Sequence, residues 1–215
     1  PLIIFNDANI ENAIEGAIAC KYRNSGQTCV CANRIFVQEG IFEKYSNSLA
    51  EMVSSFKVGD GFEELSDIGP LIDISGLKKV ERHLQDALAK GGKVLTGGQK
   101  ASQGGLYFQP TVLTNLSESM VLFKEETFGP LAPLFKFKDE KEVINMANNT
   151  NYGLAGYIFT KDLNRAWKVA EDLQFGMVGI NSGILSTEVA PFGGVKESGI
   201  GREGAIEGID EYMEI

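Results

Sequence analysis

The chain has 215 residues, of which 43% are hydrophobic and 23% are charged, so it is expected to fold as one sizeable soluble domain. Its formal net charge is −9, and because no cluster of Lys and Arg offsets this charge, nucleic acid is excluded as an expected partner. No apolar run is long enough to cross a membrane, and the three cysteines show no regular spacing, so no membrane association and a reducing, cytoplasmic location are expected.

Apolar strands alternate with amphipathic helices along the sequence. The expected strands cover residues 2–5, 30–38, 107–116, 154–160 and 177–181. The expected helices cover residues 9–22, 41–56, 73–90, 140–148 and 162–173. Because the strands are apolar on both faces, this alternation predicts an α/β fold with a mostly parallel sheet covered by helices on both faces. No internal repeat or linker-like composition interrupts it, so a single domain over residues 1–215 is expected.

The stretch with the most chemical content is residues 21–31, which read KYRNSGQTCVC. Cys29 follows a helical pattern and a glycine turn, and it stands just before the strand expected over residues 30–38. A thiol at such a junction can lie at the edge of a cleft beside backbone N–H groups, which supplies a nucleophile and oxyanion donors for a covalent acyl intermediate. The alternative is that Cys29 is a buried small hydrophobe, as most single cysteines are.

Three blocks of the chain together resemble the aldehyde dehydrogenase superfamily, and within it the succinate-semialdehyde dehydrogenases. They are KYRNSGQTCVC at residues 21–31, EETFGP at residues 125–130 and PFGGVKESGIGRE at residues 191–203. The resemblance implies an aldehyde dehydrogenase catalytic-domain fold, with Cys29 as the catalytic nucleophile that forms a thiohemiacetal and then a thioester. It also implies that the cofactor-binding domain, the general-base Glu, an Asn oxyanion donor and most of the oligomerisation arm are absent from this chain.

The resemblance further implies a nicotinamide dinucleotide, NAD or NADP, as the cofactor. Glu126 maps onto a carboxylate that accepts hydrogen bonds from two ribose hydroxyls, and Phe128 maps onto an apolar contact beside the nicotinamide ring. Glu126 could instead belong to an exposed Glu pair that precedes a packed Phe. The residues that distinguish NAD from NADP belong to the cofactor-binding domain, so this sequence does not choose between the two.

In the semialdehyde branch of the family, the resemblance places substrate contacts at three further positions. Arg23 matches an Arg that grips the distal carboxylate of the substrate, a task suited to the parallel hydrogen bonds of a guanidinium. Ser186 matches a hydroxyl that assists the same carboxylate, with Thr187 as an adjacent candidate. Phe192 matches an aromatic wall of the substrate pocket. The alternatives are structural: Arg23 could face the carboxyl end of a helix, and Phe192 could simply be buried.

Two further residues bear on regulation and on competing chemistries. Cys31 lies two positions after Cys29, and a strand would place both thiols on one face. Resemblance to those semialdehyde dehydrogenases that use such a pair implies a reversible disulfide switch, while a buried strand cysteine is the alternative. His83 is the single histidine and sits in a charged helical pattern, so it is expected on the surface, and neither a cysteine hydrolase nor a metal site is expected.

These features predict the NAD(P)-dependent oxidation of a small-molecule aldehyde, succinate semialdehyde, to succinate. The resemblance implies a homodimer or homotetramer for the parent enzyme. The isolated 215-residue chain is expected to be inactive, because it carries the nucleophile without the general base. Two alternatives stay open: a dehydrogenase for another aldehyde, and a non-catalytic binding module of the same fold.

Overall fold

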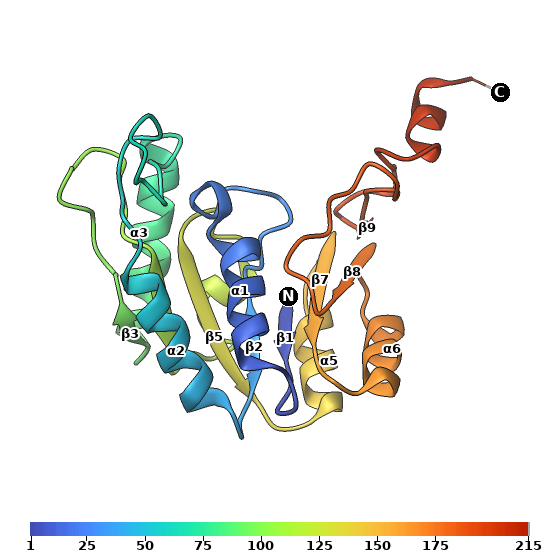
Figure 1. Ribbon diagram of the computed structural model, residues 1–215, viewed down its shortest axis with the longest axis horizontal. Coiled ribbons are helices and arrows are strands. Elements are labelled where there is room, and N and C mark those ends of the chain that lie inside the picture. The colour runs from blue at the N-terminus through green and yellow to red at the C-terminus, as the bar shows by residue number, and fades with distance from the viewer. Residues whose placement is uncertain (215) are drawn as a thin grey trace.

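A seven-stranded sheet forms the centre of the computed structural model, which describes residues 1–214 (Figure 1). Its strands are β1 (Leu2–Ile4), β2 (Ile35–Gln38), β3 (Lys93–Thr96), β4 (Thr111–Thr114), β5 (Leu131–Phe137), β7 (Ala155–Phe159) and β8 (Met177–Ile180). They are ordered β3-β4-β5-β2-β1-β7-β8, and every neighbouring pair is parallel except β3 and β4. The expectation of a mostly parallel sheet is therefore confirmed.

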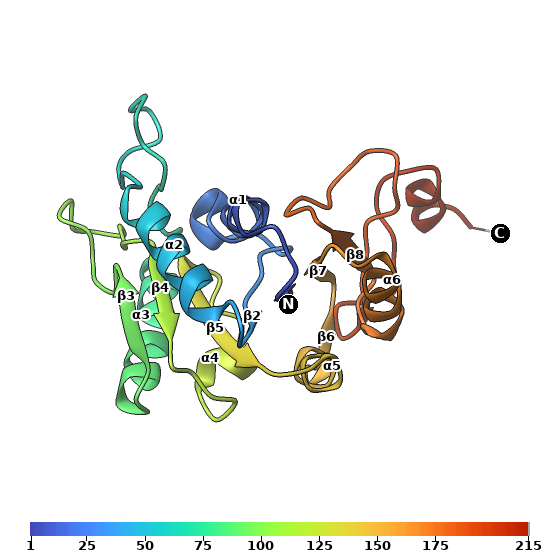
Figure 2. The same ribbon diagram turned by 60° about the horizontal axis from the view of Figure 1, so that its bottom comes forward.

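Helices cover both faces of this sheet (Figure 2). On one face lie α1 (Ile10–Lys21) and α2 (Phe42–Ser54), and on the other lie α3 (Ile74–Ala89), α4 (Val121–Lys124), α5 (Glu140–Asn148) and α6 (Leu163–Asp172). Leu2 and Ile4 of β1 pack on the α1–α2 side, whereas Ile3 packs on the opposite side. Strand β1 is thus buried on both faces, as its fully apolar sequence predicts.

Four helices begin after an Asn or Asp whose side chain accepts a hydrogen bond from the first helical turn. These N-cap residues are Asn9, Asp73, Asp139 and Asp162. Such caps satisfy backbone N–H groups that a helix leaves without partners, and each stabilises the fold by about 1 kcal/mol. Local sequence therefore fixes the starts of α1, α3, α5 and α6.

The remaining elements are short and lie outside the main sheet. A 3-10 turn, η1 (Arg23–Gly26), follows α1, and β6 (Tyr152–Gly153) pairs with β9 (Val195–Lys196) in a separate antiparallel ribbon. A second 3-10 turn, η2 (Glu207–Tyr212), belongs to a segment that extends away from the sheet (Figure 1). None of the helices within residues 1–214 is both long and apolar enough to cross a membrane.

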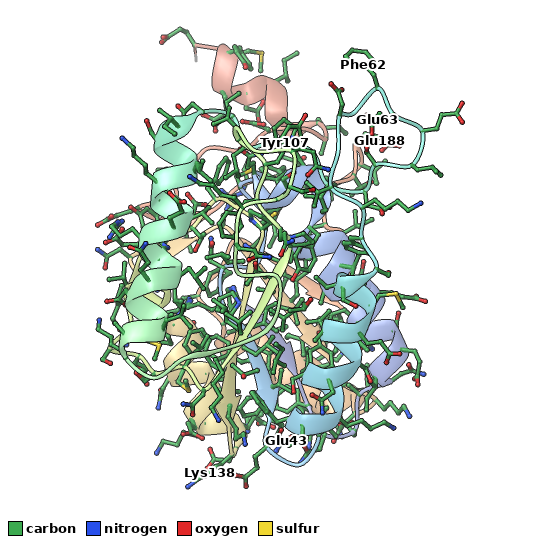
Figure 3. The ribbon with its side chains drawn as sticks, turned by 90° about the vertical axis from the view of Figure 1, so that its left-hand side faces the viewer. Glu43, Phe62, Glu63, Tyr107, Lys138 and Glu188 are labelled. Carbon is green, nitrogen blue, oxygen red and sulfur yellow. The ribbon has the colours of Figure 1, made fainter. Side chains whose placement is uncertain are left out.

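The parallel strands all begin at one edge of the sheet, which we call the amino edge. Helices α1, α5 and α6 run back across the sheet and end at this edge, before the next parallel strand begins. Figure 3 shows the polarity of the molecule: Phe62 and Glu63, on the loop after α2, lie at one end, and Glu43 and Lys138, which follow β2 and β5, lie at the other. Residues 22–34 and 125–130 lead directly into the neighbouring strands β2 and β5, so two of the three sequence motifs meet at the amino edge.

Two sequence-based expectations were wrong, and the longest strand was missed. Strand β2 begins at Ile35 and not at residue 30, because residues 28–34 form turns that bond to other parts of the fold. The longest strand, β5, was not expected, and Pro133 lies within it although proline is rare inside sheets. His83 is not a surface residue: its side chain has no exposed area and lies in the core between α3 and residues 125–127.

Candidate active site

The turn that carries Cys29 is built from three consecutive residues in the left-handed region of backbone conformation. Asn24, Ser25 and Gly26 have φ angles of 51°, 57° and 75°, which reverse the chain at the end of α1. A non-glycine residue in this region costs on the order of 1 kcal/mol or more, so the surroundings must hold it in place. At Gly26 a side chain has no room, because an ideal Cβ would lie 2.2 Å from the carbonyl oxygen of Gly129.

Hydrogen bonds to the chain before α3 hold this turn. The Ser25 hydroxyl donates to the carbonyl of Gly69 at 2.8 Å. The Gln27 side chain accepts a hydrogen bond from the N–H of Ile72 at 2.8 Å and donates to the carbonyl of Pro70 at 3.3 Å. The GQ part of the motif is therefore explained by structure: the glycine permits the close approach, and the glutamine binds backbone groups of a neighbouring segment.

Residues 28–34 turn sharply and do not form the expected strand. The N–H of Cys31 donates to the carbonyl of Thr28 at 3.0 Å, which closes a turn around Cys29. The buried Tyr157 hydroxyl donates to the carbonyl of Val30 at 2.7 Å and fixes the position that follows Cys29. The two thiols consequently do not share a strand face: Cys29 is exposed, whereas Cys31 is buried. The alternative that Cys29 is a buried hydrophobe is excluded.

A cavity of about 430 Å³ opens at the amino edge beside Cys29. Three residues predicted from the sequence line it, namely Cys29, Cys31 and Glu126. Within residues 1–214 the N–H of Cys29 donates no hydrogen bond, so it is free to bind an oxyanion next to the thiol. The cavity is therefore lined by an accessible thiol and an acidic side chain, and the backbone N–H of the thiol residue has no partner in residues 1–214.

The two adjacent acidic residues that line this cavity differ in their partners. Glu125 forms an ion pair with Arg82, and its carboxylate lies 3.4 Å from Nε2 of the His83 ring; these contacts, that of Arg82 first, lower the pKa of Glu125 to about 2. Glu126 is exposed and makes no hydrogen bond or ion pair within the described part of the chain. Phe128, which has a φ of 52°, is 37% exposed and does not line the cavity. Glu126 is thus the carboxylate that remains available to a ligand.

The predicted substrate residues lie outside this cavity. Arg23 is exposed in η1 and makes no ion pair within residues 1–214. Its side chain also forms no hydrogen bond to the carbonyl groups at a helix end in these residues, as the structural alternative would require. Ser186 and Thr187 are exposed on the loop after β8. Phe192 is partly buried and lines a second cavity of about 630 Å³. Leu154 and Ser198 line both cavities, so the two are neighbours.

The structure adds residues that sequence reasoning missed. Asn33 accepts a hydrogen bond from the N–H of Thr127 at 3.0 Å and so ties the turn of the nucleophile to the second motif. Lys21 is completely buried, its Nζ atom has no hydrogen-bond partner in residues 1–214, and burial lowers its pKa. Asn33 and Lys21 occur within or beside the motif, but nothing in their spacing distinguishes such roles. Within the same residues, no group of three or more His, Cys, Asp or Glu side chains could hold a metal ion.

An exposed thiol whose own N–H has no partner in residues 1–214, at the edge of a helix-covered parallel sheet, is chemically able to add to a carbonyl compound. The model of the aldehyde dehydrogenase family matches residues 1–215, and the chain belongs to this family. The expected aldehyde dehydrogenase catalytic-domain fold is also confirmed. The chain superposes with a TM-score of 0.97 on the crystal structure of succinate-semialdehyde dehydrogenase from Burkholderia pseudomallei, and the two are 55% identical over 99% of this chain.

Curated relatives cover the whole chain. It is 54% identical to glutarate-semialdehyde dehydrogenase of Pseudomonas putida and 53% identical to the NADP(+) succinate-semialdehyde dehydrogenase of Escherichia coli, in each case over 215 residues. These residues correspond to 44% and 45% of the two relatives, and to 44% of the Burkholderia chain. The chain therefore spans somewhat less than half the length of the proteins that it resembles.

Proposed function

We propose that residues 1–215 form the nucleophile-bearing domain of a dehydrogenase that oxidises succinate semialdehyde to succinate with NAD or NADP. The observation that carries this proposal is the exposed Cys29 thiol on the same cavity as the free Glu126 carboxylate, in a chain of the aldehyde dehydrogenase family. The proposed substrate agrees with the names of relatives that are more than 50% identical over the whole chain. The alternatives are another aldehyde and a non-catalytic binding module of the same fold.

The chemistry that this chain supplies is the covalent part of the reaction. The Cys29 thiolate adds to the aldehyde carbon to form a thiohemiacetal, and the Cys29 N–H stabilises the oxygen that becomes negatively charged. Loss of hydride converts the thiohemiacetal into a thioester on Cys29. Water then cleaves the thioester, which releases the carboxylic acid and restores the thiol. The exposure of Cys29 supports both the attack on the aldehyde and the entry of water.

The residues present fit the nicotinamide riboside part of a dinucleotide. When bound, NAD or NADP would accept the hydride that leaves the substrate carbon. Glu126 is exposed and has no ion-pair partner among residues 1–214, so its carboxylate can accept hydrogen bonds from two neighbouring ribose hydroxyls. The partly exposed Phe128 ring offers an apolar surface two residues away. The rest of the cofactor site is proposed to lie in a separate cofactor-binding domain.

We propose that Arg23 selects substrates that carry a second, anionic end. Its guanidinium is exposed six residues before Cys29, and it has no competing carboxylate within residues 1–214. Ser186 is proposed to assist it, with Thr187 as the competing hydroxyl, and Phe192 is proposed to form a wall of the substrate pocket. A longer semialdehyde would present the same carboxylate, and a relative that is 54% identical is named for glutarate semialdehyde. The length of the carbon chain that the substrate pocket accepts is therefore a further question of specificity.

The test compares succinate semialdehyde with an uncharged aldehyde of similar length, in the full-length protein that carries these residues. Replacing Arg23 with Leu is expected to lower kcat/KM for the semialdehyde by about 10- to 100-fold, because hydrogen bonds to a charged group are lost, and to change that for the uncharged aldehyde little. Arg23→Lys keeps the charge without the planar fork and is expected to give an intermediate value. Equal handling of both aldehydes by native and variant proteins would contradict the carboxylate role. The isolated 215-residue chain serves as the negative control and is expected to reduce no NAD(P)+.

We also propose that Cys31 is a redox partner of Cys29. The Cys31 thiol is buried and its Sγ lies 2.8 Å from the Thr28 hydroxyl, whereas the Cys29 thiol is exposed, so we expect disulfide formation to require a rearrangement of the turn at residues 28–31. Hydrogen peroxide would take two electrons from the two thiols, and a disulfide and two water molecules would form. Peroxide should then inactivate the native protein, and dithiothreitol should restore its activity. Peroxide inactivation of the native protein without a Cys29–Cys31 disulfide, as judged by mass spectrometry, would contradict the pairing.

We make three further proposals about the assembly, location and domain organisation of the whole protein. They are a homodimeric or homotetrameric assembly, a cytoplasmic location and a single domain over residues 1–215. The three free cysteines support a reducing location. Gel filtration of the full-length protein and fractionation of cells would test the first two.

A further inference from the structure

A buried histidine faces the segment that carries Glu126. His83 lies on α3 with no exposed area, and its Nδ1 atom is 3.0 Å from the hydroxyl of Thr127, which is only 1% exposed. Its Nε2 atom is 3.4 Å from the carboxylate of Glu125. The imidazole therefore contacts the residues on both sides of Glu126 in the sequence, while Glu126 itself is left without a partner in residues 1–214.

The same segment is held by contacts on its other sides. The N–H of Thr127 donates to Asn33, on the turn that follows Cys29. Gly129 packs so closely on α3 that an ideal Cβ would lie 2.4 Å from a methyl carbon of Val80. Phe128, between these two fixed positions, has a φ of 52°. The backbone at Phe128 is thus strained, and the contacts of Thr127 and Gly129 on either side hold it in place.

The bond between His83 and Thr127 does not depend on which ring nitrogen carries the proton. Burial lowers the pKa of His83, so the ring is neutral near pH 7, whereas Glu125 is ionised. If Nε2 carries the proton, it donates to Glu125, and Nδ1 accepts from the Thr127 hydroxyl. If Nδ1 carries the proton, it donates to Thr127, and Nε2 accepts from Arg82, whose guanidinium lies 3.2 Å away. The contact to Thr127 persists in both forms.

We propose that His83 is a positioning residue for the cofactor: through Thr127 and Glu125 it fixes the backbone that aims Glu126 at the ribose hydroxyls of the nicotinamide nucleotide. This inference rests on the proposed function of Glu126. It assigns a role to a buried histidine that does not line the cavity and acts through its neighbours. Loss of the contact frees the segment and weakens binding of the dinucleotide, while the Cys29 turn keeps its separate hydrogen bonds to Gly69 and Ile72.

The test uses two pairs of variants in the full-length protein, with the dinucleotide that it accepts. Thr127→Val removes the hydroxyl at nearly constant volume, and Thr127→Ser keeps it. His83→Leu removes both ring nitrogens, and His83→Asn keeps a polar atom near the place of Nδ1. Thr127→Val and His83→Leu are expected to raise the KM and the Kd of the dinucleotide about 10-fold, with kcat and the KM of the aldehyde within about twofold of native. Thr127→Ser and His83→Asn are expected to restore most of the affinity.

Glu126→Gln separates this inference from the proposed function. If Glu126→Gln leaves the dinucleotide KM unchanged, the ribose role of Glu126 fails, and the positioning role fails with it. If Glu126→Gln raises that KM while Thr127→Val leaves it unchanged, the positioning role alone is overturned. A fall in kcat together with equal rises in both KM values for Thr127→Val would indicate a general structural role and would also overturn it. Should His83→Leu fail to fold, the Thr127 pair decides.

Discussion

Replacing Cys29 with serine is expected to lower kcat/KM for aldehyde oxidation by about four orders of magnitude or more, because a serine hydroxyl without an adjacent base is a poor nucleophile. The thermal midpoint should change little, since the Cys29 side chain is exposed and its sulfur makes no hydrogen bond within residues 1–214. Activity would be measured from NAD(P)H absorbance with the full-length protein, and folding from circular dichroism.

Thiol labelling gives an independent control for this prediction. Of the three free cysteines, Cys29 is exposed, whereas Cys20 and Cys31 are buried, and burial raises the pKa of Cys20 to about 11. One rapidly reacting thiol is therefore expected in the native protein, with loss of activity in proportion to its labelling, and none in Cys29→Ser. Cys31→Ser should retain both the rapid thiol and most of the activity. Activity that survives complete labelling of Cys29 would contradict its role as the nucleophile.

Replacing Gly26 with alanine is expected to be the most damaging single-methyl change in the site. The substitution forces a side chain into a φ of 75°, and its Cβ would overlap the carbonyl group of Gly129 at 2.2 Å from the oxygen. The backbone conformation costs about 1–2 kcal/mol and the overlap about 1–3 kcal/mol, so a loss of about 2–5 kcal/mol in the free energy of unfolding is expected. Because relief requires the turn of Cys29 to move away from the Glu126 segment, kcat/KM should fall about 100-fold.

A second glycine, Gly104, allows the cost of the backbone conformation to be measured separately from the cost of the steric overlap. Gly104 has a φ of 71°, but an added Cβ would meet nothing within 4 Å. Gly104→Ala therefore carries the backbone cost alone and should destabilise the protein by about 1–2 kcal/mol with native kinetics. Urea unfolding of both variants would provide the comparison. Equal losses of stability would contradict the close contact between Gly26 and Gly129 as the reason for the glycine in the motif.

Much of the fold could be predicted because local sequence and tertiary burial agree. The helix expected over residues 73–90 is observed as α3 (Ile74–Ala89), since Asp73 caps its start and its apolar residues recur at helical spacing. Strands 2–5 and 154–160 were predicted correctly from short apolar runs between turn residues. In these segments the local sequence alone is enough to predict the secondary structure and which residues are buried.

The errors occur where a distant partner decides the conformation. Residues 28–34 are apolar enough for a strand, but Tyr157, Cys20 and Thr127 bind their backbone or side chains and hold them in turns. His83 is surrounded in sequence by charged residues, yet two of its partners, Glu125 and Thr127, lie more than 40 positions away. The motifs identified Cys29 and Glu126, but only the fold brings them onto one cavity, because β2 and β5 are neighbours in the sheet. The spacing of residues along the sequence does not reveal that β2 and β5 are neighbours in the sheet.

The helix ends at the amino edge determine which charged groups this edge can bind. Helix carboxyl ends carry partial negative charge, and α5 demonstrates their preference, since Arg34 donates to the carbonyls of Met146 and Ala147 at 2.8 and 2.9 Å. Helix α3 does begin at this edge, but the carboxylate of Asp73 already occupies its first turn. A pyrophosphate, which is held best at helix amino ends, thus finds no cradle of that kind here. Under the proposed function, this edge would contact the nicotinamide riboside through Glu126 and would leave the pyrophosphate to be bound by other residues.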